Sequence, residues 1–147
     1  MADGRQEVRV VLQEGMHFVG TAYPPEESVE IHLDAKADVG GEGLGARPQS
    51  LVLVSLGGCT GMDVISILRK KRQDVTGLEL RVSASRAEEH PRVFTHIWVK
   101  YIVTGRHVDP AAVERSIELS MERYCPVAGM LKPVVPIETS YEIVEAE

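Results

Sequence analysis

Two cysteines carry the strongest chemical signal in the sequence. Cys59 lies in Gly57-Gly58-Cys59-Thr60-Gly61, inside a long predicted helix, and Cys125 lies in Tyr124-Cys125-Pro126, where a second helix should end. A thiolate is a strong nucleophile, and two neighbouring thiols can be oxidised to a disulfide. The residues alone also allow two buried free thiols, a structural disulfide or part of a metal site. Structural disulfides are unusual in cytosolic proteins, and no CxxC or HxxxH metal spacing accompanies the cysteines.

The two cysteines are not expected to be equally reactive. Cys125 follows the second predicted helix, and carbonyl groups at a helix C-terminus oppose thiolate formation. Cys59 stands 11 residues after the proline that starts its helix, so the N-terminal amides lie about 16 Å away, beyond the reach of the helix dipole. A cation close to Cys59 is therefore needed for reaction at neutral pH. Arg47 is our candidate, with Arg123 and Arg5 behind it.

Other polar and aromatic residues are assigned non-catalytic positions. Trp98 and Tyr101 fall on a predicted strand and are interpreted as core or interface residues rather than as a ligand cage. Asp63, one turn beyond Cys59, would oppose ionisation of the thiol if it pointed at the sulfur, so we expect it to pair elsewhere. The histidines share no spacing and are interpreted as surface or strand residues: His17, His32, His90, His96 and His107.

The elements that must position the cysteines follow from apolar periodicity and from breaker residues. The predicted strands cover residues 6–13, 16–23, 28–34, 78–86, 93–104 and 135–144, and the predicted helices cover residues 48–72 and 110–125. Asp109-Pro110 supplies an N-cap and a first-turn proline for the second helix. The order β-β-β-α-β-β-α-β predicts an α+β fold with mainly antiparallel sheets, in a single domain over residues 1–147.

The central helix has an unusual composition. Its first half, Leu51-Val52-Leu53-Val54-Ser55-Leu56, is apolar on every face, as expected of a helix buried all round. The glycines around Cys59 each cost about 1 kcal/mol relative to alanine in a helix interior, so close approach of another backbone or of a substrate is expected. A chain of 147 residues has few elements to cover such a helix. We therefore predict a homodimer with this helix near the two-fold axis, and a monomer whose sheets wrap the helix is the alternative.

Composition restricts the class of protein further. With 44% hydrophobic and 26% charged residues, the chain can form a real core, which excludes disorder of the whole. The net charge of -6 argues against nucleic acid as the main partner. The basic cluster Arg69-Lys70-Lys71-Arg72 is interpreted as a solvated helix end, where cations complement the helix dipole. Neither an N-terminal apolar segment nor an uninterrupted run of about 20 apolar residues is present, so a cytoplasmic protein without a membrane partner is expected.

Three stretches combine with the element order into a recognisable pattern. They are Arg47-Pro48-Gln49-Ser50-Leu51-Val52-Leu53 followed by Gly57-Gly58-Cys59-Thr60-Gly61-Met62-Asp63-Val64, the turn His90-Pro91-Arg92-Val93-Phe94-Thr95, and Tyr124-Cys125-Pro126-Val127. This combination resembles the OsmC/Ohr family of thiol peroxidases over nearly the whole chain. The resemblance implies an intertwined homodimer with active sites at the subunit interface, Cys59 as the peroxidatic cysteine and Cys125 as the resolving one. It also implies organic hydroperoxide substrates, no metal or flavin cofactor, and recycling by a lipoyl-type dithiol.

The sequence departs from the family pattern near the start of the central helix. Many members have a glutamate in a P-x-E-L setting, where this chain has Ser50 beside Gln49. The arginine that the family places on the first hairpin has no clear equivalent in residues 13–17. Two hypotheses follow: a thiol peroxidase that forms a Cys59–Cys125 disulfide, or a non-enzymatic module of the same fold that binds an apolar ligand or senses redox state. Retention of both cysteines favours the enzyme, and the missing glutamate favours the module.

Overall fold

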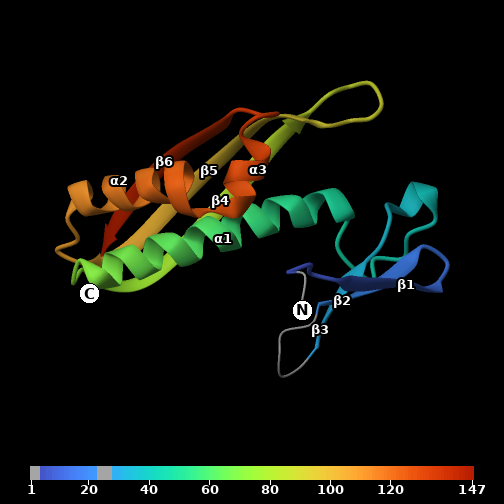
Figure 1. Ribbon diagram of the computed structural model, residues 1–147, viewed down its shortest axis with the longest axis horizontal. Helices are drawn as coiled ribbons and strands as arrows, with labels where there is room; N and C mark the ends of the chain where they lie inside the picture. The colour runs from blue at the N-terminus through green and yellow to red at the C-terminus, as the bar shows by residue number, and fades with distance from the viewer. Residues whose placement is uncertain (1–3, 23–27) are drawn as a thin grey trace. The chain divides into compact units, whose positions relative to one another are not determined.

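The computed structural model describes residues 4–22 and 28–147, so the predicted strand end at Tyr23 lies outside the described residues. Contacts divide the chain into two compact units, residues 1–52 and 53–147, which are considered separately below. The order of helices and strands agrees with the α+β prediction (Figure 1). The predicted fold class is therefore confirmed.

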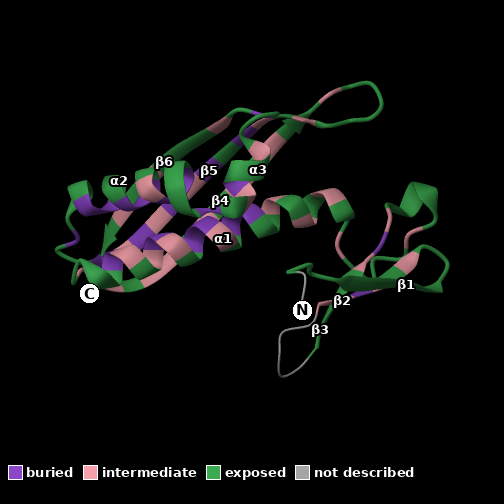
Figure 2. Ribbon diagram, viewed as in Figure 1, coloured by how far each residue is buried: buried purple, intermediate pink, exposed green. Residues whose placement is uncertain are grey.

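The first unit is built on a three-stranded antiparallel sheet. Its strands are β1 (Val8–Glu14), β2 (His17–Ala22) and β3 (Val29–Leu33), with β2 in the centre. Because directly paired residues point to the same side of a sheet, the register makes one face entirely apolar. That face consists of Val8, Val10, Leu12, Phe18, Gly20, Ala22, Val29, Ile31 and Leu33. Most of these side chains are exposed, as the green colour of β1 and β3 in Figure 2 shows.

A buried carboxylate organises the loop that follows β3. Asp34 accepts hydrogen bonds from the backbone N–H groups of Ala35, Glu42 and Leu44 at 2.8, 3.0 and 3.0 Å. These donors, those of Glu42 and Leu44 above all, lower the pKa of the Asp34 carboxyl below its ordinary value. The predicted glycine-rich loop also contains a short 3-10 turn, η1 (Ala37–Val39).

The long helix α1 (Pro48–Lys70) begins at the predicted proline. The carbonyl oxygen of Arg47 accepts the first hydrogen bonds of the helix, from Ser50 and Leu51. The helix is long and apolar enough to cross a membrane by length and composition, with a mean hydropathy of 1.9 in its most apolar window. Core helices of globular proteins have the same property, and Leu56, Val64 and Leu68 of α1 are fully buried in the core of the second unit.

The second unit buries α1 on one side only, so the predicted burial on every side, which needs a second copy of the chain, stays a prediction. Val54 and Met62 are 65% and 73% exposed, whereas Leu56 and Leu68 are 0% exposed. The cause is that the second unit offers α1 one layer of sheet, and that layer covers one side of the helix. An apolar strip of α1 therefore remains uncovered within the chain.

The second unit is a sheet with helices on one face (Figure 1). Strands β4 (Asp74–Arg86) and β5 (Phe94–Arg106) are antiparallel, and β6 (Ile137–Glu145) joins β5 in parallel. The parallel pairing follows from the helices between β5 and β6, which carry the chain back along the sheet. Alternate residues of β5 form the centre of the core: Ile97, Val99, Tyr101 and Val103.

The predicted second helix, residues 110–125, corresponds to α2 (Pro110–Leu119) and the π-helical turn η2 (Ser120–Tyr124). A further short helix that was not predicted, α3 (Pro126–Leu131), follows it. Asp109 caps α2 as predicted, because its side chain accepts a hydrogen bond from the N–H of Ala111 at 3.0 Å. The helical segment ends at Cys125 as expected, and its last turn is the wider π-helical turn η2.

Candidate functional site

Cys59 lies in the middle of α1 and is partly buried against the core of the second unit. The glycines around it are partly explained by packing on β4. A Cβ atom on Gly57 would meet Val82 at 3.1 Å, and one on Gly61 would meet Leu80 at 3.0 Å. These two glycines, four residues apart on one face of the helix, are approached closely by side chains of β4 rather than by the backbone or substrate that we expected. Gly58 has open space around its Cα, so packing gives no reason for it.

Cys125 follows the second helix, as predicted, and it is also the N-cap of α3, where its Sγ accepts a hydrogen bond from the N–H of Ala128 at 3.3 Å. The helix start at Pro126, which we did not predict, adds this N–H donor to the C-terminal carbonyl groups that we expected to oppose thiolate formation. Burial, with 4% of the residue exposed, nevertheless keeps Cys125 a thiol rather than a thiolate.

The structure brings the two cysteines together within the second unit. Both are free thiols. Burial, followed by interaction with the nearby Cys59 thiol, raises the pKa of the Cys125 thiol above its ordinary value. The pair therefore consists of a buried, protonated thiol next to a more accessible one, which is an arrangement that can close to a disulfide.

A buried hydrogen-bond chain lies beside the cysteine pair. Thr60 Oγ1 is 2.7 Å from both the Tyr101 hydroxyl and Ser120 Oγ, and Ser120 Oγ donates to Asp63 Oδ2 at 2.9 Å. Asp63 thus pairs with Ser120, which confirms that it pairs with a group other than the Cys59 sulfur. Tyr101 is a fully buried core residue as expected, whereas Trp98 is 41% exposed. Sequence reasoning missed the chain because its members come from elements 41 and 60 residues apart.

The three candidate cations occupy different parts of the molecule. Arg5 and Arg47 belong to the first unit, and Arg47 is exposed immediately before α1. Arg123 shares the second unit with both cysteines, and its Cζ lies 5.9 Å from the ring centroid of Tyr124. The choice of cation for Cys59 therefore remains a prediction.

Histidines and other metal-ligand residues are dispersed. His17 and His32 face each other across β2 and β3 at 2.9 Å, and His96 contacts Glu138 at 3.2 Å. Among residues 4–22 and 28–147, no group of three or more His, Cys, Asp or Glu side chains could hold a metal ion.

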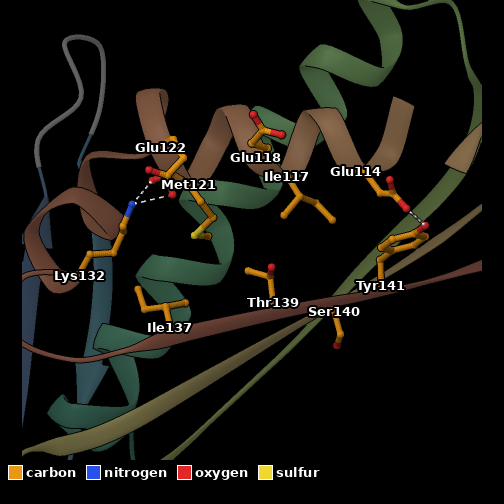
Figure 3. A pocket seen from close by; sticks show the side chains of 10 residues that line it. All are labelled: Glu114, Ile117, Glu118, Met121, Glu122, Lys132, Ile137, Thr139, Ser140 and Tyr141. Atoms are coloured by element: carbon orange, nitrogen blue, oxygen red, sulfur yellow. Dashed lines mark hydrogen bonds and ion pairs between the residues drawn. The ribbon is translucent and has the colours of Figure 1, made fainter. Parts of the chain in front are cut away.

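Two hollows lie on the helical side of the second unit. One, of about 420 Å³, has Cys125 in its wall together with Met121, Arg123, Tyr124 and Lys132. The other, of about 410 Å³, lies between α2, η2 and β6 (Figure 3). The carboxylates in the second hollow already have partners: Glu114 accepts from the Tyr141 hydroxyl at 2.6 Å, and Glu122 pairs with Lys132 at 3.0 Å.

Comparison with known proteins identifies the family. Residues 40–140 match the family model described as OsmC-like protein. The chain belongs to the OsmC-like protein family. This span includes α1, both cysteines and the whole hydrogen-bond chain.

Relatives of this OsmC-like chain cover almost its full length. Protein YhfA from Escherichia coli strain K12 is 44% identical over 140 residues, covering 95% of this chain and 99% of YhfA. A hypothetical protein from Aquifex aeolicus VF5 has a crystal structure with a TM-score of 0.83 and 34% identity, covering 97% of this chain and 98% of that one. An organic hydroperoxide resistance protein OsmC from Legionella pneumophila shares the fold at a TM-score of 0.64, with 13% identity over 94% of this chain and 96% of that one.

Proposed function

We propose that this OsmC-like protein is a cysteine-based peroxidase that reduces organic hydroperoxides. The observation that carries the proposal is the pair of free thiols, one buried and one accessible, held together in the second unit. Membership of the OsmC-like family and the fold shared with organic hydroperoxide resistance proteins support a redox role. Cys59 is the nucleophile, Cys125 is the resolving cysteine, and Arg47 is the cation that activates Cys59.

The proposed reaction proceeds in two steps on this chain. The Cys59 thiolate attacks one peroxide oxygen, the O–O bond breaks, and the leaving alkoxide takes a proton to become an alcohol. Cys59 is then a sulfenic acid. The Cys125 thiol attacks this sulfur, the S–O bond breaks, and the hydroxyl leaves with the thiol proton as water. An external dithiol of the lipoyl type reduces the disulfide by two exchanges and becomes a disulfide itself. No metal or flavin takes part.

The protein is proposed to act as a cytoplasmic homodimer in the antioxidant response. Two uncovered apolar surfaces support association: the apolar face of the β1–β2–β3 sheet and the strip of α1 that includes Val54 and Met62. Contiguous exposed apolar surface on a folded protein marks an interaction site. In such a dimer residues 1–147 act as one domain, with the active sites at the subunit interface.

The decisive test compares three proteins in the reduced state. Each is mixed with cumene hydroperoxide in a stopped-flow instrument, and thiol loss is followed. Cys59→Ser should abolish peroxide consumption, whereas Cys125→Ser should be oxidised once and then stall. Mass spectrometry after one equivalent should find a Cys59–Cys125 disulfide in the native protein and a sulfenic or sulfinic Cys59 in Cys125→Ser. The reverse pattern would contradict the assigned roles.

A second candidate function is a non-enzymatic module that binds an apolar ligand or senses redox state. Two observations favour it: Ser50 occupies the position where many members have glutamate, and a hollow of about 400 Å³ lies on the apolar face of the first unit. Its lining includes Val10, Met16 and Phe18. Native protein that binds an apolar fluorescent ligand but consumes no hydroperoxide would support this alternative.

A further inference from the structure

The chain of hydroxyl groups beside the cysteines has only one possible direction. Each hydroxyl group can donate one hydrogen bond, and Ser120 donates its hydrogen bond to the Asp63 carboxylate. Thr60 must therefore donate to Ser120, and Tyr101 must donate to Thr60. Thr60, Ser120 and Tyr101 are all 0% exposed, so water does not compete for these bonds. Burial also raises the pKa of Tyr101 to about 12, so Tyr101 remains a donor at every physiological pH.

The chain joins the elements that carry the two cysteines. Thr60 directly follows Cys59 on α1. Ser120 begins the π-helical turn η2, and its carbonyl oxygen accepts the N–H of Cys125 at 2.8 Å. Ser120 thus bonds through its hydroxyl to the Cys59 helix and through its carbonyl to the backbone of Cys125. Extra-wide turns of this kind occur frequently at functional sites.

A polar connection constrains position more tightly than the apolar packing around it. Apolar side chains accept small shifts by repacking, whereas a buried hydroxyl loses its partner if the distance grows. Disulfide closure requires the sulfurs to come within about 2 Å of each other, with the Cα atoms about 4.4 to 6.8 Å apart. Misplacement by about 1 Å can slow a reaction of prearranged groups about 100-fold.

We propose that Thr60 and Ser120 are positioning residues that hold Cys125 against Cys59 for disulfide closure, with Tyr101 and Asp63 fixing the two ends of their hydrogen-bond chain. This inference rests on the pairing of the two cysteines in the proposed function. It does not depend on a hydroperoxide being the oxidant. In the condensation, the Cys125 S–H and the Cys59 S–OH bonds break, one S–S bond forms, and water leaves.

The test measures closure with an oxidant other than peroxide. Reduced protein is equilibrated with oxidised and reduced glutathione. In this reaction Cys59 and Cys125 are oxidised to one disulfide, and one molecule of oxidised glutathione is reduced to two thiols. The equilibrium gives the effective concentration of Cys125 at Cys59. Thr60→Val removes the central hydroxyl at nearly constant size, and Ser120→Ala removes the next one. Both should lower the effective concentration by about tenfold to a hundredfold.

Two controls separate positioning from folding. Thr60→Ser keeps the hydroxyl and should restore the native equilibrium, and Thr139→Val makes the same change at an exposed site on β6 and should leave it unchanged. In Thr60→Val and Ser120→Ala, alkylation of Cys59 should keep its native rate and buried Cys125 should stay protected. A structural role alone would expose Cys125 as the variant unfolds.

The measurements distinguish failure of the positioning inference from failure of the peroxidase proposal. Native equilibria in both Thr60→Val and Ser120→Ala would overturn the inference, as would losses accompanied by Cys125 alkylation at the rate of denatured protein. A native protein that never forms the Cys59–Cys125 disulfide would overturn it as well. If native protein closes the disulfide with glutathione but consumes no hydroperoxide, the peroxidase proposal fails and the positioning inference stands.

Discussion

The two units of this molecule bury their apolar residues to very different extents. In the second unit, alternate residues of β5 are fully buried beneath the helices, and the cysteine pair lies in this core. In the first unit, every residue of β1 is exposed, including Val8 at 62% and Val10 at 57%. A three-stranded sheet with one fully apolar face is not stable when water covers that face. The contrast indicates that the second unit has its own core, whereas the apolar face of the first unit is not covered within that unit.

The largest effect is expected from a charge on the apolar face of the first unit. Val10→Asp would place a carboxylate in the proposed interface, which costs more than about 3 kcal/mol when the charge is unpaired. We expect loss of the dimer and loss of amide protection in residues 8–22 and 28–33. Trp98, the single tryptophan, lies on β5 and should keep its native fluorescence because the second unit stays folded. Sedimentation and hydrogen exchange measure the two results.

The neighbouring valine is a matched control for this experiment. Val11 lies on the same strand but its side chain points to the opposite, mixed face of the sheet, and it is 42% exposed. Val11→Asp should change stability by no more than about 0.5 kcal/mol. If Val10→Asp also leaves the association state and the amide protection unchanged, the apolar face is open to solvent in solution, and association through it is ruled out.

A truncation in the core of the second unit should have the next largest effect. Leu68→Ala removes a fully buried side chain from α1 and should lower the free energy of unfolding by about 2 to 5 kcal/mol. Val134→Ala, at a site 79% exposed, should cost no more than about 0.5 kcal/mol. Chemical denaturation, followed by Trp98 fluorescence, measures the free energy of unfolding of both variants. Equal losses of stability would show that the second unit lacks an independent core.

Much of this fold could be predicted because its signals are local. Pro48 and Asp109-Pro110 predicted the starts of α1 and α2, and the six predicted strands match the observed ones to within four residues at each end. The side of α1 that stays exposed could not be predicted, since Val54 and Leu56 look equally apolar in the sequence. The parallel pairing of β6 depends on how the preceding helices return the chain, which is also a tertiary property.

The sequence singles out the two cysteines of the candidate site, but it does not predict what surrounds them. The family pattern singled out Cys59 and Cys125, and the structure brings both into one unit. The helix start at Pro126 was missed because the widened turn at Ser120 is held by Thr60 and Asp63 from a distant helix. Serine and threonine inside helices give no signal of such bonds.

The third effect tests the cation proposed for Cys59. Arg47 belongs to the first unit and Cys59 to the second, and we predict that Arg47 reaches the thiolate from its own loop or from the partner subunit. If Arg47 activates Cys59, Arg47→Ala should raise the pH midpoint of Cys59 alkylation by about one pH unit or more, because an adjacent cation favours the charged thiolate. Circular dichroism should show that the fold is unchanged.

The other arginines decide how an unchanged midpoint is interpreted. Arg123→Ala and Arg5→Ala are measured in parallel, and a shift in either one would transfer the role from Arg47. A midpoint above about 9 in the native protein would mean that Cys59 has no activating cation, since a free thiol titrates near 8.5. That result would favour the binding-module function.

The smallest effect is expected at Asp34, a buried carboxylate that organises the loop after β3 in the first unit. Its pKa is lowered in the folded protein by the N–H groups of Glu42 and Leu44, so ionised Asp34 stabilises the loop. The stabilisation is complete above the unfolded-state pKa of about 3.9 and is lost as the pH falls through the lower folded-state pKa. Asp34→Asn should therefore weaken amide protection at Glu42 and Leu44 near pH 7, and the difference from the native protein should shrink under acid conditions.

Asp38→Asn changes an exposed carboxylate in the same loop and should leave that protection unaltered. Equal protection in Asp34→Asn and the native protein at pH 7 would mean that the charge of Asp34 does not stabilise this loop of the first unit.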